Sequence, residues 1–576
     1  MRAERLIIRN FRNLADVEVP LSPGTVIVGE NRSGKSNLLH ALRLVLDPAM
    51  PNSERHLRRE DFWDGLSDGT PGWDPMADGT SIEISVDIGD FDDEPGVIAA
   101  LSDALLEGEP MRARLTYVWG PQDTGDVADG AAVYRWRIVG GDKARDARVP
   151  ADVREHLLLT FLHALRDVEA DIRSWRRSPL RALLEAAATA AEGDALDEVR
   201  QAMQEANEQL NQLDAIADLS RRISGQTLTM VGHNQALEAE LGVAPPDPLR
   251  LIRGMRLFVD GDAHRDLASA SLGTLNVLYL ALLQLGLDQR LERSEIGHVV
   301  LAVEEPEAHL HPHLQRLIFR GLLGSGGSSR TTLVTTQSPY IASVTPPRSL
   351  VVLRSADGQT QARAAGTAEL DEAEWDDIAR YLDATRAELV FARRCLLVEG
   401  YGEQVLLPGL AAALGMDLDK LGVTVCAIFG THFSAYARFC QALGIPWAVL
   451  TDGDPADDRT LAGEARGRRL LERLGRPGDL AANGVFVGST TLEYDVFTCS
   501  PGNQAACCLV LSEFAQSPAQ RARLDSWAGS QPDRTEFLAA VSQIGGGKGR
   551  FAQRLSTRRL DPPAYIKDAV SYLAAQ

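Results

Sequence analysis

The pattern of hydrophobic and polar residues changes several times along this chain, and each change predicts a different kind of element. In the middle, an unbroken apolar run from Val299 to Val303 leads directly into Glu304 and Glu305. Such a run is typical of a strand that is buried on both faces of a parallel α/β sheet. Because these sheets bind ligands at the carboxyl ends of their strands, we expect the two glutamates at a ligand site. A core strand that ends in a solvated acidic turn is the alternative.

Other short segments of the first part of the chain also predict strands. We expect strands at Leu6–Ile8, Val17–Pro20, Thr25–Val28 and Thr331–Thr336. Apolar and polar residues alternate over most of Ser81–Ile88, Arg112–Trp119 and Tyr134–Val139. Alternation predicts antiparallel strands with one solvated face, which would form a β-lobe beside the parallel sheet.

From Ala151 to about Leu241 the period becomes helical. Apolar residues recur there at alternating spacings of three and four, at Leu196, Val199, Met203, Ala206, Leu210 and Leu213. This seam is typical of a coiled coil. Two interpretations stay open: a helical arm that dimerises, and a hairpin that packs on the chain's own helix around Leu157 to Trp175. Residues Ala244 to Pro248 are the expected linker that follows.

Beyond residue 366 predicted strands and helices alternate. Helices are expected at Glu369–Tyr381, Thr385–Arg394 and Phe433–Leu443, and strands at Cys395–Val398, Val423–Phe429, Trp447–Leu450 and Val485–Val487. This alternation predicts a second, smaller parallel sheet.

The strand at Thr25–Val28 runs into a segment, Gly29 to Ser36, that fits the pattern GxxxxGK[ST]. Its glycines allow backbone N–H groups to curl around phosphates, and Asn37–Leu46 follows as a helix whose N-terminus faces the same anion. Lys35 is expected to reach the β- and γ-phosphates, and the Ser36 hydroxyl to join Mg²⁺. Strand, loop and helix occur in the order that this phosphate-binding motif requires.

Three carboxylates of the second half each follow a predicted strand: Glu399, Asp452 and Asp454. They can converge at one edge of the sheet, where unpaired carboxylates repel each other unless a cation joins them. Oxygen ligands favour Mg²⁺ or Mn²⁺, and two such ions stabilise the attacking and leaving oxygens of a phosphodiester. Solvated turn residues are the alternative for any one of these acids.

Composition narrows the function classes. The 576 residues carry a net charge of −21, which argues against a general nucleic-acid coat but not against a local basic cleft. Basic residues gather locally at Arg466, Arg468, Arg469, Arg473 and Arg476, and again at Lys548, Arg550, Arg554, Arg558 and Arg559. We interpret both groups as candidates for contact with a DNA backbone, with ordinary basic helix faces as the alternative. Six cysteines without metal spacing, no signal peptide and no membrane-length apolar run favour a cytoplasmic protein.

Four stretches, in their order along the chain, resemble an ABC-type ATPase of the recombination-and-repair branch. They are the phosphate loop, the small-residue turn Ser269–Asn276, the stretch EEPEAHLHP and the stretch TTQSP. That branch includes SMC-like, RecF-like and OLD-family proteins. The resemblance implies that Glu304 lies near Mg²⁺, that Glu305 is the catalytic glutamate, and that Gln337 replaces the usual switch histidine. ATP would be contacted by Gly29, Asn31, Gly34, Lys35 and Ser36, and by Ser271 and Gly273 of a second subunit. The resemblance therefore implies a homodimer or higher oligomer.

The stretches VEGYGE and LTDGD of the second half resemble a Toprim domain, most closely the version in OLD-family nucleases. The resemblance implies that Glu399, Glu403, Asp452 and Asp454 surround the metals, with Asp452 essential for catalysis. Glu493 would add a ligand to the second metal, and Lys548 would neutralise charge on the scissile phosphate.

We therefore predict an α/β protein, an ABC-type ATPase head with an inserted helical dimerisation arm, followed by a Toprim parallel-sheet domain. The expected segments are residues 1–150 (ATPase with β-lobe), 151–245 (helical arm), 246–365 (rest of the ATPase), 366–394 (helical connector) and 395–576 (Toprim domain with its C-terminal extension). The implied function is an ATP-binding endonuclease that uses Mg²⁺ or Mn²⁺, acts on DNA and takes part in phage defence or DNA processing. Resemblance also implies a UvrD-like helicase partner. A non-cutting, ATP-gated DNA clamp is the main alternative.

Overall fold

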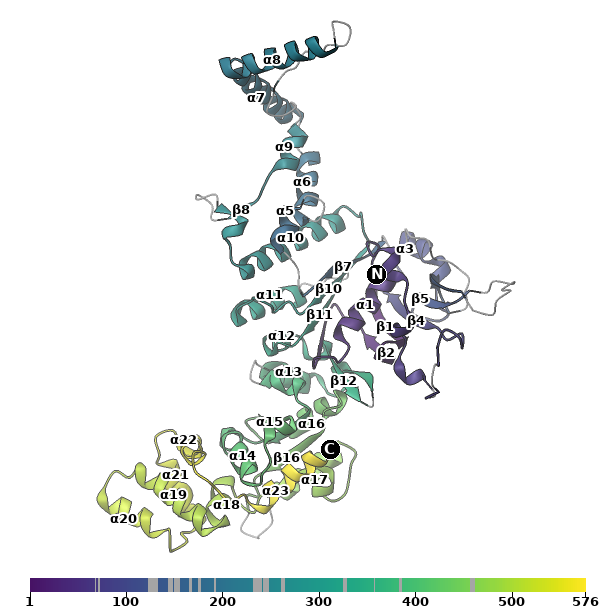
Figure 1. Cartoon of the computed structure of the whole chain (residues 1–576). Helices are drawn as coiled ribbons and strands as arrows, with labels where there is room; N and C mark the ends of the chain where they lie inside the picture. The colour runs from purple at the N-terminus through teal and green to yellow at the C-terminus, as the bar shows by residue number, and fades with distance from the viewer. Residues whose placement is uncertain are drawn as a thin grey trace. The chain divides into compact units, whose positions relative to one another are not determined.

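The computed structural model describes residues 1–67, 69–70, 73–122, 133–142, 149, 156–164, 168–174, 178–190, 193–231, 241, 248–259, 265–324, 329–356, 358–382, 386–455 and 462–576. These residues form two compact units, Met1–Ala164 with Gly297–Gln576, and Leu165–Ile296 (Figure 1). No described helix is long and apolar enough to cross a membrane. The six cysteines all lie in the described part, and none of them is joined to another by a disulfide bond.

A six-stranded sheet with the order β13-β12-β3-β11-β10-β7 forms the centre of the first unit. Its strands are β3 (Gly24–Gly29), β7 (Leu157–Leu162), β10 (His298–Glu304), β11 (Arg330–Thr336), β12 (Leu350–Ala356) and β13 (Gln359–Ala364). All pairs are parallel except β12 with β13. The predicted central strand is confirmed, since the side chains from Val299 to Val303 are fully buried. Helices α1 (Lys35–Leu46), α11 (Pro312–Gly324) and α12 (Pro339–Ala342) follow strands of this sheet.

An antiparallel sheet with the order β2-β1-β4-β5-β6 lies in the same unit and confirms the predicted β-lobe. Its strands are β1 (Arg2–Phe11), β2 (Leu14–Pro20), β4 (Ile82–Gly89), β5 (Ala113–Pro121) and β6 (Tyr134–Gly140), and the short helices α2 (Asn52–Arg55) and α3 (Pro95–Ala100) lie between them. One apolar core joins this sheet to α1 and to the parallel sheet, so the helix behind the phosphate loop is packed on both.

The second unit is mostly helical. Its elements are α5 (Val168–Arg173), α6 (Pro179–Ala190), α7 (Gly193–Asn211), α8 (Asp214–Val231), α9 (Pro248–Gly254), β8 (Phe258–Val259), β9 (Arg265–Asp266) and α10 (Leu272–Glu292). The predicted seam lies on α7 up to Leu210, and a short turn then leads into α8, which contacts α7. Apolar side chains of this pair remain exposed, among them Val199, Leu219 and Ile223.

The helical prediction for Leu157 to Trp175 is wrong over its first part. Leu157–Leu162 is strand β7, which pairs in parallel with β10 over residues His298 to Val303. Its six residues, LLLTFL, show no hydrophobic periodicity that would distinguish a buried strand from a buried helix. Pairing with the neighbouring strand β10 makes the segment a strand. The predicted linker from Ala244 lies outside the described residues, except for Pro248, where α9 begins.

The C-terminal part of the first unit contains a fully parallel sheet with the order β15-β14-β16-β17, as predicted. Its strands are β14 (Arg394–Val398), β15 (Val423–Ala427), β16 (Trp447–Thr451) and β17 (Val485–Val487). The helices are α13 (Glu372–Tyr381), α14 (Tyr401–Ala413), α15 (Leu418–Leu421), α16 (Phe433–Ala442), α17 (Ala462–Arg473), α18 (Leu492–Cys499), α19 (Pro501–Glu513), α20 (Pro518–Ser526), α21 (Arg534–Ser542), α22 (Gly547–Leu555) and α23 (Ala564–Ala575). The helix predicted at Thr385–Arg394 is confirmed over Arg386–Phe391, which is a 3₁₀-helix, but is wrong at its end, because Arg394 begins β14.

Candidate functional site

The phosphate loop connects β3 to α1, and contacts among its own residues hold its shape. Gly34 caps α1 with a φ of 95°, a left-handed conformation that glycine adopts without strain. A side chain there would also collide with Asn13, since a Cβ would lie 2.8 Å from its Nδ2. The buried Lys35 Nζ donates to the carbonyl oxygens of Gly29 (2.8 Å) and Glu30 (3.1 Å). The loop therefore surrounds an ammonium group at the place where the motif binds phosphate.

The acids at the end of β10 meet this loop. Ser36 Oγ donates to Glu304 Oε1 at 2.5 Å, and Lys35 Nζ lies 3.7 Å from Glu305 Oε1. The Gln337 side chain, just beyond β11, donates to Glu305 Oε1 at 2.6 Å. Burial lowers the pKa of Lys35, although Glu305 and Glu307 act in the opposite direction. Five of the predicted residues thus come together from the ends of three neighbouring strands.

Two residues that the sequence analysis missed belong to this site. Glu307 accepts hydrogen bonds from the Gln337 backbone N–H (2.7 Å) and from Thr336 Oγ1 (2.9 Å), and burial raises its pKa. His163, directly after β7, has its Nδ1 4.0 Å from Glu304 Oε2, and burial lowers its pKa. Glu307 was visible as the third acid of EEPEAH, whereas His163 had no signal because β7 was expected to be helical.

Ser271 and Gly273 belong to the second unit. Ser271 caps α10, and its Oγ accepts a hydrogen bond from the Thr274 backbone N–H at 3.2 Å. The Ser271 side chain is exposed. Contact of this turn with the nucleotide of a second subunit stays a prediction.

The carboxylates of the second sheet gather at the carboxyl ends of β14 and β16. The backbone N–H of Asp452 donates to Glu399 Oε1 at 3.0 Å, and Asp452 Oδ1 accepts from the Leu492 backbone N–H at 2.9 Å. Glu403, in the first turn of α14, accepts from the Gly400 backbone N–H at 3.1 Å. Glu493, in the first turn of α18, is buried like Asp452 and Glu403.

Burial and mutual repulsion raise the pKa values of two of these acids, Asp452 and Glu403. Burial, followed by the charges of Glu403, Glu399 and Glu493, raises the pKa of Asp452 to about 8. Burial also raises the pKa of Glu403, again with Glu493 and Glu399 as neighbouring charges. The site therefore concentrates more negative charge than buried carboxylates tolerate without a cation.

Lys548 reaches the same carboxylates from α22, where its Nζ lies 3.1 Å from Glu493 Oε2. Burial lowers the pKa of Lys548, but Glu493, Asp452 and Glu403 outweigh that effect, so the pKa is raised. The ammonium group therefore stays charged beside the acids at neutral pH.

Arg466 differs from the sequence interpretation, which grouped it with DNA-binding arginines. Its guanidinium donates to Asp454 Oδ2 at 3.0 Å, to Glu399 Oε1 at 3.2 Å and to the Asp452 carbonyl oxygen at 2.7 Å. The interpretation is wrong for this residue because Arg466 lies on the same side of α17 as the buried Gly463 and Leu470. Arg466 therefore points to the carboxylates, whereas Arg468 and Arg469 of the same helix are exposed.

The residues present fit a divalent cation. Their donor atoms are all carboxylate oxygens, which favour Mg²⁺ or Mn²⁺ over softer metals. Lys548 and Arg466 bring two positive charges to the group, at Glu493 and at Glu399 and Asp454, yet the pKa of Asp452 is still raised to about 8 by burial and by the neighbouring glutamates. In the described part of the chain, no three His, Cys, Asp or Glu side chains are already arranged as a set of metal ligands. Small side-chain movements, including that of Arg466, would accompany metal binding.

Family models of known proteins match stretches in both parts of the chain. Residues 390–454 match the family model for the TOPRIM domain of overcoming lysogenization defect (OLD) protein-like proteins, and residues 1–94 match an AAA ATPase domain. Residues 142–343 match the model described as AAA domain, putative AbiEii toxin, Type IV TA system.

Several relatives match over most of their length. The chain is 27% identical to the OLD nuclease of Thermus scotoductus, with 79% of this chain and 83% of that protein covered. It is 21% identical to the endonuclease GajA of Bacillus cereus, with 83% and 79% covered. The solved C-terminal region of the Burkholderia pseudomallei OLD protein is 37% identical and covers 32% of this chain and 98% of that one, with a TM-score of 0.29.

Fold and sites together define an ABC-type ATPase joined to a Toprim domain. The chain belongs to the OLD family.

Proposed function

We propose that this chain is an ATP-binding, divalent-metal-dependent DNA endonuclease whose cutting is regulated by nucleotide. The observation that carries the proposal is the group of buried carboxylates at the ends of β14 and β16, with Lys548 among them. The names of the relatives agree: one is an OLD nuclease and another an endonuclease.

In the nuclease site, Glu399, Asp452 and Asp454 would hold one metal ion, and Glu403 and Glu493 would complete a second position. The bound ions supply charge stabilisation for the attacking and leaving oxygens of the phosphodiester. Lys548 would bind a non-bridging oxygen of the scissile phosphate, because its ammonium is charged and half exposed. Arg466 forms ion pairs with Glu399 and Asp454 and so neutralises part of the charge of these two candidate ligands.

In the ATPase site, Lys35 would exchange the carbonyl oxygens of the loop for the phosphates of ATP. Ser36 and Glu304 already lie in contact, so they can share one Mg²⁺. Glu305 would orient the attacking water, and Gln337 fixes that carboxylate by its hydrogen bond. An amide cannot carry the charge of a histidine, so slow hydrolysis suited to a nucleotide sensor is expected.

The exposed apolar residues of α7 and α8 support self-association, because a contiguous exposed apolar face is typical of an interface. We propose a homodimer in which Ser271 and Gly273 of one subunit contact the nucleotide of the other. Cytoplasmic location, a UvrD-like helicase partner and a role in phage defence are proposed from the family resemblance alone.

The test is a supercoiled-plasmid assay with Mg²⁺ or Mn²⁺, each with and without ATP. Wild type should give nicked or linear DNA, and Asp452→Ala should give none. The Lys35→Ala variant should still cut the plasmid, but the amount of product should no longer differ between reactions with and without ATP. Equal cutting by Asp452→Ala would refute the site. Binding of DNA without any cutting by wild type would favour the clamp.

A further inference from the structure

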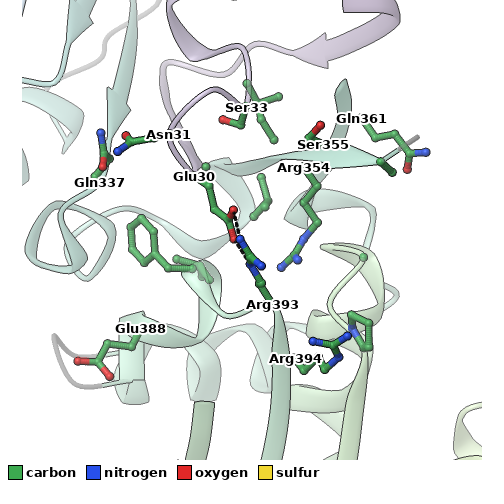
Figure 2. A pocket seen from close by; sticks show the side chains of 18 of the residues that line it. Glu30, Asn31, Ser33, Gln337, Arg354, Ser355, Gln361, Glu388, Arg393 and Arg394 are labelled. Atoms are coloured by element: carbon green, nitrogen blue, oxygen red, sulfur yellow. Dashed lines mark hydrogen bonds and ion pairs between the residues drawn. The ribbon is translucent and has the colours of Figure 1, made fainter. Parts of the chain in front are cut away.

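A cavity of about 840 Å³ lies between the phosphate loop and the start of β14. It is lined by Glu30, Asn31 and Ser33 of the loop, by Gln337, and by Arg393 and Arg394 from the other side (Figure 2). One ion pair crosses it: Arg393 Nε donates to Glu30 Oε1 at 2.6 Å, and Arg393 Nη2 donates to Glu30 Oε2 at 2.8 Å. Two parallel hydrogen bonds of this kind fix the direction of both side chains as well as their distance.

Glu30 and Arg393 each lie next to a strand that leads to one of the two candidate sites. Glu30 directly follows the last residue of β3, and its carbonyl oxygen is held by the Lys35 ammonium at 3.1 Å. Arg393 directly precedes β14, and Glu399 directly follows the same strand. The pair therefore joins the phosphate loop to the strand that presents a predicted metal ligand.

A second contact holds the same segment. Arg354 on β12 donates to the carbonyl oxygen of Ala392 at 2.5 Å, and Figure 2 shows its side chain directed toward the Glu30–Arg393 pair. Strand β12 is hydrogen-bonded to β3, with Leu353 opposite Gly29. Ala392 and Arg393 thus make two contacts with the ATPase sheet, one with Arg354 on β12 and one with Glu30 after β3.

The pair has the features of a contact that nucleotide can change. Lys35 Nζ donates to the Glu30 carbonyl oxygen, so a phosphate that binds this ammonium group competes with a contact that positions Glu30. Both side chains of the pair are more than half exposed, at 61% for Arg393 and 54% for Glu30. Exposed pairs are weak, so two arrangements of similar free energy are accessible to it.

Building on the proposed function, we propose that the Glu30–Arg393 pair is the positioning element through which nucleotide at the phosphate loop alters the metal site at the end of β14. Without nucleotide, Arg393 is held by Glu30 and β14 presents Glu399 as described above. With nucleotide, Glu30 moves with its released carbonyl, Arg393 loses its fixed direction, and the start of β14 shifts.

The test measures Mn²⁺ binding to the full-length protein by electron paramagnetic resonance, with and without a non-hydrolysable ATP analogue. In wild type the nucleotide should change the Kd of the Toprim site by about two- to fivefold, the range expected of an exposed ion pair. Asp452→Ala identifies the Mn²⁺ signal of that site. Arg393→Ala and Glu30→Gln should each remove the nucleotide effect, and the double variant should add nothing to either single one.

Arg348→Ala is the matched control. Arg348 forms a similar exposed pair, with Glu372 at 2.6 Å, but it does not touch the phosphate loop. This variant should keep the full nucleotide effect. Nucleotide binding, measured separately with a fluorescent analogue, should persist in Arg393→Ala.

Three results would overturn the coupling: no nucleotide effect on Mn²⁺ binding in wild type, an unchanged effect in both Arg393→Ala and Glu30→Gln, or an equal loss in Arg348→Ala. The proposed function fails separately. If wild type shows the nucleotide effect but never cuts DNA, the coupling stands and the endonuclease assignment falls.

Discussion

Replacing Asp452 by asparagine is expected to stabilise the metal-free protein while it abolishes DNA cutting. Burial and neighbouring glutamates raise the pKa of Asp452 from 3.8 to about 8 in the folded chain. The folded state therefore binds the proton more tightly than the unfolded state, and stability is lost as pH rises from 3.8 toward 8. At pH 7 this loss amounts to roughly 4 kcal/mol at most, at about 1.36 kcal/mol per pKa unit.

The substituted asparagine side chain would carry no charge and would keep an acceptor for the Leu492 backbone N–H, which now donates to Asp452 Oδ1. The free energy of unfolding of Asp452→Asn in EDTA should therefore exceed that of wild type at pH 7, and the gain should shrink toward pH 4.5. Excess Mg²⁺ should stabilise wild type but not the variant, so the difference should narrow or reverse.

Asp495→Asn is the matched control. Asp495 is also a buried aspartate, but it accepts hydrogen bonds from Ser489 and Thr490 that an amide cannot fully replace. Burial raises the pKa of Asp495 as well, so the charge removed offsets the weaker hydrogen bonds, and this variant should gain less stability than Asp452→Asn. Thermal and urea unfolding at pH 4.5, 7 and 8.5 measure both variants. A gain for Asp452→Asn that is equal at every pH, or a loss in EDTA at pH 7, would refute the charge argument.

Other predictions concern single side chains. Lys548→Met should lower plasmid cutting about 100-fold or more while Mn²⁺ still binds, and near-normal cutting would exclude a role at the phosphate. Gln337→His should raise steady-state ATP hydrolysis about tenfold, and an unchanged rate would show that the glutamine does not limit it. His40 stacks on Phe11, and burial lowers its pKa from 6.5 to about 4. Stability should therefore fall by roughly 3 kcal/mol as pH drops from 6.5 to 4, and His40→Gln should reduce this loss in urea unfolding.

The elements that the sequence predicted best are those whose residues determine their structure locally. The phosphate loop needs an apolar strand before it, glycines within it and a helix after it, and all three are present from Thr25 to Leu46. Alternation in Ser81–Ile88 likewise predicted a strand with one buried face, which is β4. The runs at Val299–Val303 and Val485–Val487 needed no partner to be recognised as strands.

Predictions from the sequence were wrong where several structures satisfy the same local pattern. Leu157–Leu162 is apolar enough for either a strand or a helix, and only the edge of β10 made it a strand. Arg466 looked like one member of a basic helix face. The direction of α17 against the sheet turned that one side chain toward Glu399 and Asp454, while Arg468 and Arg469 remained exposed.

The sequence by itself determined which residue types occur at strand ends, and therefore which chemistry this protein can carry: a phosphate loop, two glutamates at the end of β10, and carboxylates after β14 and β16. Only the tertiary structure decided which charges meet. Glu30 and Arg393 lie 363 positions apart, and Lys548 reaches Glu493 from a separate helix. Local periodicity specifies an element and its buried face, but charge pairing depends on the packing of distant elements, whose separation and direction no local pattern contains.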